Sequence, residues 1–112
     1  MMNISYDDLL LINECICYEA SEASVVINRN NLLSALSVQQ WYEDKRLLAS
    51  ALVRSLTIAH GFQDGNKRTA AVVGAMVCEY TCDEYTMIDC ILSIAKGELK
   101  DVEDIASILY QF

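Results

Sequence analysis

The residues best suited to chemistry lie in one segment, residues 60–69, whose sequence is HGFQDGNKRT. His60 is the only histidine of the chain, and because an imidazole titrates near neutral pH it is suited to take a proton from an attacking hydroxyl as a general base. Asp64 offers a carboxylate oxygen of the kind that Mg²⁺ binds together with substrate phosphates. Phe62, between them, is interpreted as an anchor whose buried ring fixes the loop. The segment therefore predicts proton abstraction beside a magnesium-bound phosphate.

A helix is expected to begin directly behind this loop, at Asn66, and its first residues include the cations Lys67 and Arg68. A helix N-terminus already carries about half a positive charge and unpaired N–H groups, so cations there are mildly repelled. Two cations beside Gly65 are best explained if an anion normally lies between them. We expect these four residues to hold a phosphate through backbone N–H groups, an ammonium and a guanidinium fork. The segment is not a P-loop, because only three residues separate Gly61 and Gly65.

Each of these residues also has a purely structural interpretation. A histidine near a helix end is often a C-terminal cap, which would explain His60. Asp64 would also serve as the N-cap of the following helix, and Asp-Gly is a common turn pair. Lys67 and Arg68 would also be ordinary solvated charges. The anion-binding catalytic loop is favoured because base, carboxylate, glycine, asparagine and two cations fall within nine residues.

The remaining sequence predicts helices that would position this loop. The apolar spacing is helical nearly throughout and indicates helices at residues 5–19, 31–41, 43–60, 66–77, 86–95 and 101–110. Ser5 and Asp8 resemble a capping box, and Gly61 would stop the third helix. The fourth helix is apolar almost all round, so we expect it at the centre of the fold. The predicted fold is an all-α bundle of about six helices, one domain over residues 1–112.

The same spacing predicts which side chains the first two helices bury. The buried face expected for the first helix consists of Leu9, Ile12, Cys15 and Ile16. The apolar positions of the second are Leu32, Leu33, Leu36 and Trp41.

Composition excludes several classes of function. A length of 112 residues with 54% hydrophobic side chains allows a core that needs neither disulfides nor metals. Sixteen acidic against eight basic residues argue against a nucleic-acid partner or an anionic membrane surface. Five cysteines without a C-x-x-C pair favour buried thiols in a reducing compartment. Without a signal peptide or an apolar run of about 20 residues, we expect a cytoplasmic protein with no membrane partner.

The pattern HxFxDGNxR at residues 60–68 resembles the signature of the Fic/Doc family, H-x-F-x-[DE]-[GA]-N-x-R. Both ends of the chain are also similar to Doc ("death on curing") toxins, although only the loop is specific. The resemblance implies a six-helix Fic core that binds ATP and Mg²⁺ and modifies a protein hydroxyl. When the roles of the family motif are carried over to the matching positions, His60 is the general base, Asp64 binds magnesium and Phe62 anchors the loop. The residues that would bind phosphate are Gly65, Asn66, Lys67 and Arg68.

Departures from the family pattern bear on which group is transferred. AMP-transferring members usually have a second arginine where this chain has Ala71, and a small residue where it has Lys67. In both respects the chain resembles Doc toxins, which phosphorylate a threonine of elongation factor Tu and stall translation. The kinase reaction is therefore preferred. Gly65 resembles the AMP-transferring members, which keeps AMP transfer as the alternative. An interpretation of another class is a catalytically silent Fic-fold module that only binds a partner.

The resemblance also implies protein partners. The internal inhibitory motif of many Fic proteins, [ST]-x-x-x-E-[GN], is absent, since no glutamate here precedes Gly or Asn. A toxin would then be restrained by a small Phd-like antitoxin whose flexible tail folds onto it. Tyr6, Leu9 and Leu10 are candidates for its groove, with core packing as the preferred alternative. Residues 39–42, including Trp41, are candidates for contact with the target protein, and burial of the tryptophan is the alternative.

Overall fold

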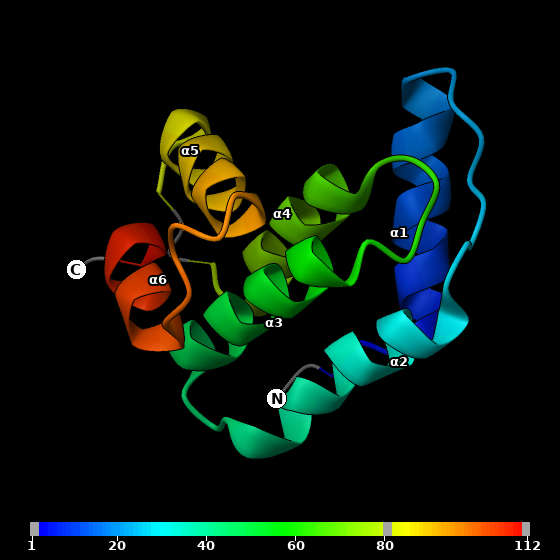
Figure 1. Cartoon of the computed structure of the whole chain (residues 1–112). Helices are drawn as coiled ribbons and strands as arrows, with labels where there is room; N and C mark the ends of the chain where they lie inside the picture. The colour runs from blue at the N-terminus through cyan, green and yellow to red at the C-terminus, as the bar shows by residue number, and fades with distance from the viewer. Residues whose placement is uncertain (1–2, 80–81, 111–112) are drawn as a thin grey trace.

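The computed structural model describes residues 3–79 and 82–110, which form six α-helices and one short 3₁₀ helix (Figure 1). In chain order they are α1 (Tyr6–Glu19), α2 (Arg29–Ser37), η1 (Val38–Trp41), α3 (Lys45–Ala59), α4 (Asn66–Val77), α5 (Glu84–Ala95) and α6 (Val102–Leu109). The predicted all-α bundle is confirmed. None of the helices in these ranges combines the length and the apolar character that crossing a membrane requires.

The central element of the bundle is α3, not α4 as the composition predicted. It packs against α2, η1, α4, α5 and α6, and every residue from 48 to 53 is buried. Figure 1 shows α3 and α4 in the middle, with α1 and α2 to one side and α5 and α6 to the other. The α4 helix is apolar all round, yet Val72 and Met76 are 38% and 42% exposed, because nothing in the described chain covers that face. Apolar content alone therefore did not identify the central helix.

Short-range caps set where most helices begin. Ser5 and Asp8 form the reciprocal capping box that the sequence predicts for α1. Asp44 and Asp101 cap α3 and α6 by accepting backbone N–H groups of the first turn. Asp83 caps α5 in the same way, so that helix begins at Glu84, two residues before the predicted start.

The buried face of α1 differs from the one predicted. Leu9 is buried, but Cys15 is exposed, and the other fully buried positions are Asn13 and Cys17. Ile12 and Ile16 are only half-buried. The face turned inward lies against the loop before α4, whose backbone is polar, and this explains why an asparagine occupies it.

The second predicted helix is divided, because α2 gives way to the 3₁₀ turn η1 at Val38. Leu32 and Leu36 are buried as predicted, whereas Leu33 is exposed and Trp41 is 73% exposed. The tryptophan is therefore not a core residue.

Tyr6, Leu9 and Leu10 have the packing of core side chains. Leu9 is fully buried in the core, and Tyr6 and Leu10 pack partly against it. Their positions match the core-packing alternative and leave little of them for a partner to contact.

All five cysteines are free. Cys17, Cys78 and Cys90 are buried, Cys82 is half-buried and Cys15 is exposed. Three of the five thus fit the expectation of small buried hydrophobic side chains.

Candidate functional site

The loop between α3 and α4 begins at His60, which takes a left-handed conformation with φ 47° and ψ 47°. The sequence assigned the helix stop to Gly61, but the left-handed residue is the histidine. Glycine is required at position 61 for a different reason. A Cβ atom there would lie 2.4 Å from two carbon atoms of the Leu32 side chain, so only glycine allows the loop to approach α2 this closely.

Asn66 and Phe62 close the loop on itself. The Phe62 N–H donates to Oδ1 of Asn66 at 2.9 Å, and Nδ2 of Asn66 donates to the Phe62 carbonyl at 2.7 Å. The ring of Phe62 is 1% exposed, as expected of an anchor. The side-chain amide of Asn66 is therefore engaged with the Phe62 backbone through both its oxygen and its nitrogen, and the backbone N–H of this residue lies in the first turn of α4.

A short extended segment holds the loop from its other side. Val26 and Phe62 form an isolated antiparallel β-bridge. The Ile27 N–H donates to the Gly61 carbonyl and the Gln63 N–H donates to the Val25 carbonyl, both at 2.8 Å. Hydrogen bonds within the loop and from residues 25–28 therefore fix the backbone between α3 and α4.

The side chains of His60 and Asp64 are left largely free. His60 is the C-cap residue of α3 through its left-handed backbone, but its side chain is exposed and within the described ranges the imidazole has no hydrogen-bond partner, so the imidazole itself does not bond to the last carbonyls of the helix. The half-exposed carboxylate of Asp64 accepts one long hydrogen bond, from Gln63 Nε2 at 3.4 Å. Asp64 is not the N-cap of α4, because Gly65 occupies that position.

The N-terminus of α4 differs from that of every other α-helix in the described chain, since it has no side-chain cap, and like α2 and α3 it has no acidic residue in its first turn. Gly65 is left-handed there, with φ 78°, and a Cβ on it would lie 3.1 Å from Nδ2 of Asn13. Lys67 and Arg68 are both exposed. This helix end therefore presents unpaired N–H groups and cations without an acid of its own.

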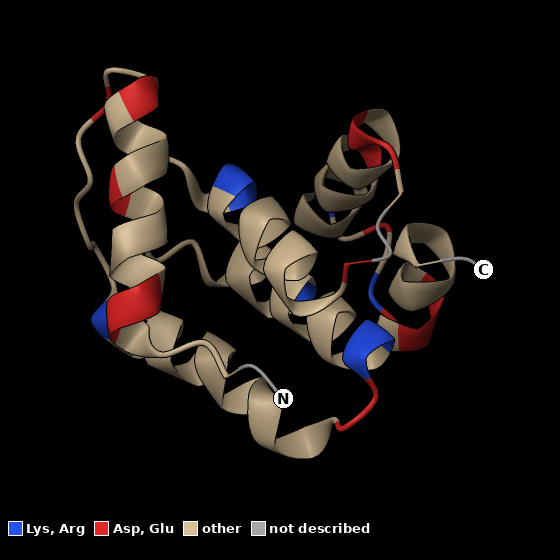
Figure 2. Ribbon diagram, turned by 180° about the vertical axis from the view of Figure 1, so that it is seen from behind, with Lys and Arg blue, Asp and Glu red and all other residues tan. Residues whose placement is uncertain are grey.

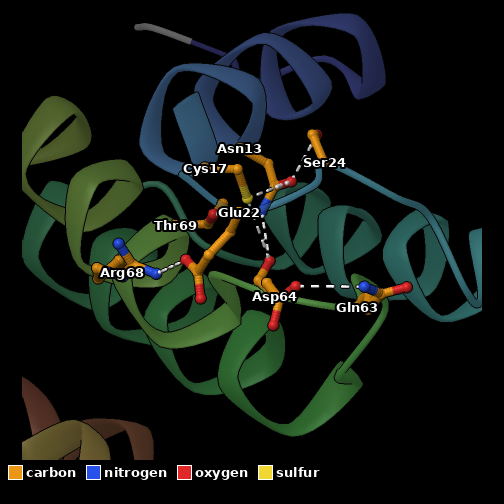
Figure 3. A network of polar contacts seen from close by, with 8 residues as sticks. All are labelled: Asn13, Cys17, Glu22, Ser24, Gln63, Asp64, Arg68 and Thr69. Carbon is orange, nitrogen blue, oxygen red and sulfur yellow. Dashed lines mark hydrogen bonds and ion pairs between the residues drawn. The ribbon is translucent and has the colours of Figure 1, made fainter. Parts of the chain in front are cut away.

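Arg68 has a partner that the sequence did not indicate. Its Nη2 donates to the Glu22 carboxylate (Figure 3). The chain reverses after α1 through Ser21, whose φ is 57°, and this turn brings Glu22 next to α4. The pair is partly exposed, with 50% of the arginine side chain and 33% of the glutamate side chain accessible.

A hollow of about 510 Å³ lies beside Arg68, between α1, α4 and α5. Its apolar walls include Ile16, Val72, Ala75, Met87 and Ile88. Its carboxylates are Glu19, Asp83 and Glu84. The size is that of pockets that hold small molecules, typically about 300–1,000 Å³.

The acid available to a metal at this site is Asp64. Within the described chain no group of three or more His, Cys, Asp or Glu side chains is placed to hold an ion. A single carboxylate fits Mg²⁺, which commonly binds one or two carboxylates and completes its octahedron with phosphate oxygens and water. The donor set thus fits a magnesium ion that arrives with a nucleotide.

Figure 2 shows the basic residues at separate places on the ribbon, one of which is the start of α4. The same view shows acidic residues at several positions of α1, and three carboxylates line the hollow. The cations at the start of α4 are therefore a local feature of an acidic chain with a formal charge of −8.

Asn13, which bonds to the loop and to α4, and Glu22, which pairs with Arg68, were not singled out from the sequence, and neither was Ser24, which donates to Asn13. An asparagine in the apolar register of α1, four positions after Leu9, is a signal that sequence reasoning could have used. No sequence pattern indicates the contact of Glu22 with Arg68, which spans 46 positions.

No protein-family model matches this chain, and no curated protein is significantly similar to it.

Proposed function

We propose that the chain is an ATP-dependent, protein-modifying transferase that moves the γ-phosphate of ATP to a threonine or serine hydroxyl of another protein. The observation that carries this proposal is the junction between α3 and α4. There, an uncapped helix N-terminus with Gly65, Lys67 and Arg68 follows an imidazole and a carboxylate that are nearly free of protein partners.

The reaction assigns one task to each group. His60 takes the proton of the target hydroxyl, whose oxygen attacks the γ-phosphorus while the bond from that phosphorus to the β,γ-bridging oxygen breaks. The products are a phosphate monoester and ADP. The N–H groups of α4 and the Lys67 ammonium hold phosphate oxygens, and the guanidinium of Arg68 joins them once it leaves Glu22. A magnesium ion, bound by Asp64, would supply charge neutralisation between phosphates.

The hollow beside Arg68 supports a nucleotide as the substrate. Its apolar walls suit a purine base, and its carboxylates would repel phosphates, so the nucleoside end is the part that it would take. The phosphates would then extend from Arg68 along the first turn of α4 toward His60.

AMP transfer to the same hydroxyl is the alternative. Gly65 is the residue that favours it by resemblance, but the left-handed backbone there favours a glycine whichever group is transferred. Position 71 holds an alanine that lines the hollow, and so adds no second arginine to the site. We therefore keep the kinase reaction as the preferred proposal.

By its resemblance to Doc, we propose that the protein is a cytoplasmic toxin. Its target would be a threonine of elongation factor Tu, so that modification stalls translation, and a Phd-like antitoxin with a flexible tail would restrain it. The exposed Trp41 in η1 offers a contact surface for one of these proteins.

The deciding experiment incubates the purified chain and Mg²⁺ with a bacterial lysate, and separately with elongation factor Tu, using γ-labelled or α-labelled ATP. Labelling from γ-labelled ATP alone, lost in His60→Ala, is the expected result. Labelling from α-labelled ATP alone would replace the kinase by AMP transfer. No labelling, together with growth inhibition that persists in His60→Ala, would favour the catalytically silent binding module.

A further inference from the structure

Asn13 connects α1 with the candidate site. It is 0% exposed, and Figure 3 shows its amide between the segment after α1 and the loop before α4. Its Nδ2 donates to the Asp64 carbonyl at 2.9 Å and to Oγ1 of Thr69 at 3.2 Å. Its Oδ1 accepts from Oγ of Ser24 at 2.7 Å and from Sγ of Cys17 at 3.5 Å. Both amide hydrogens and both carbonyl lone pairs are therefore used.

These bonds fix Asp64 through its backbone. The Asp64 carbonyl is turned toward α1, where Sγ of Cys17 also lies within 3.7 Å of it, while the carboxylate stays half-exposed. Thr69, in the first turn of α4, is held by the same amide and is 1% exposed. One side chain thus sets the position of Asp64 relative to the helix end that carries Lys67 and Arg68.

Packing alone does not account for an asparagine here. A residue that only filled the buried face of α1 would be a leucine, as at Leu9, because asparagine is a poorer helix former and a buried amide must find all its partners. The amide also lies 3.1 Å from the point where a Cβ of Gly65 would stand, so these two positions are fitted to each other.

We propose that Asn13 is a positioning residue of the candidate site, which acts through the Asp64 carbonyl and Thr69 to hold the Asp64 carboxylate in place beside the N-terminus of α4. The proposal rests on the proposed function as far as catalysis is concerned, but the positioning itself can be measured without turnover.

Four substitutions separate positioning from packing. Asn13→Asp keeps the acceptor for Ser24 and replaces the donor to Asp64 by an oxygen. Thr69→Val removes one acceptor of the Asn13 amide at constant shape, and Thr69→Ser restores it. Thr57→Val is the matched control, because the Thr57 hydroxyl is also buried on a helix but has no hydrogen-bond partner in the described chain.

Two readouts are needed, both at a temperature where every variant is folded. The first is amide hydrogen exchange of residues 62–66 in the free protein, expected to be faster in Asn13→Asp and Thr69→Val only. The second is the Mg²⁺ concentration for half-maximal transfer from ATP, expected to rise about tenfold in the same two variants, as for other residues that orient a metal-binding carboxylate. Thr69→Ser and Thr57→Val are expected to match the wild-type protein in both.

The outcomes distinguish the two proposals. A lower melting temperature with unchanged loop exchange and unchanged Mg²⁺ dependence would make Asn13 a purely structural residue and overturn the inference. A wild-type protein that transfers nothing would overturn the proposed function instead, and loop exchange alone would then decide whether Asn13 positions Asp64.

Discussion

The guanidinium of Arg68 donates to the carboxylate of Glu22, which follows α1 in the chain. The cation expected to bind a phosphate is thus already neutralised by a partly exposed acid. Such pairs contribute only about 0–1 kcal/mol, so a nucleotide phosphate can displace the glutamate, although at a cost to its own affinity. The pair therefore makes phosphate binding depend on the charge at position 22.

Glu22→Gln tests this competition. Removing the charge leaves Arg68 free for phosphate, and we expect ATP·Mg²⁺ to bind about two- to fivefold more tightly, which corresponds to at most about 1 kcal/mol. Isothermal titration calorimetry measures the change, with Glu14→Gln on the exposed side of α1 as the control. Weaker binding in Glu22→Gln would show instead that the glutamate orients the arginine for its ligand.

Two substitutions of His60 separate its chemical role from its backbone role. The general-base proposal expects both His60→Ala and His60→Gly to lose transfer by at least about 100-fold while nucleotide binding persists. The left-handed backbone at this position favours glycine, so His60→Gly is expected to be about 1 kcal/mol more stable than His60→Ala. Labelling assays and urea denaturation report the two effects independently. Transfer retained in both variants would exclude His60 as the base.

The local features of the fold were predictable from the sequence because their causes lie within a few residues. The capping box of Ser5 and Asp8 and the cap at Asp101 are hydrogen bonds between near neighbours. The loop between α3 and α4 was placed correctly because its glycines and its asparagine interrupt two strongly apolar helices.

Features that depend on distant segments were not predictable in this way. Cys15 was expected inside and is exposed, because the loop at Asp64, 51 positions beyond Asn13, determines which face of α1 is buried. The exposed face of α4 was likewise not predictable, because the apolar composition of α4 does not reveal that α3 takes the central position. Sequence periodicity reports that a face is apolar, but not which neighbour covers it.

Replacing Asn66 by alanine is expected to loosen the loop more than it affects any phosphate contact. The substitution leaves the Phe62 N–H and carbonyl, both buried, without partners, and we expect a loss of about 2 kcal/mol of unfolding free energy. Asn30→Ala on the exposed side of α2 is the matched control in urea denaturation. Equal stabilities of the two variants would mean that the Phe62 backbone finds other partners.

Filling the hollow tests whether it takes the nucleoside. Ala75 lies on its wall, and a phenylalanine there would occupy the space of a purine, so we expect Ala75→Phe to weaken ATP binding at least about tenfold, or about 1.4 kcal/mol. Ala95→Phe, at the exposed end of α5, controls for the added apolar surface. Inorganic phosphate binding is expected to be unchanged in both. Unaltered ATP affinity in Ala75→Phe would place the nucleoside elsewhere.

The helix caps predict how the fold responds to acid. Asp44 accepts hydrogen bonds from backbone N–H groups, chiefly that of Leu47, and Asp83 accepts one chiefly from the N–H of Thr86. These bonds lower the pKa of both carboxyls below the usual 3.8. A carboxyl whose pKa is lower in the folded than in the unfolded state stabilises the fold above its unfolded pKa, and this contribution disappears as the pH falls through the folded pKa. An asparagine at each position still accepts hydrogen bonds from the backbone N–H groups but does not titrate. The double variant Asp44→Asn/Asp83→Asn is therefore expected to lose less unfolding free energy than the wild-type protein as the pH falls from about 5 to about 2. Urea midpoints across this range measure the difference. Identical acid dependence in the two proteins would show that these caps contribute nothing to the acid sensitivity of the fold.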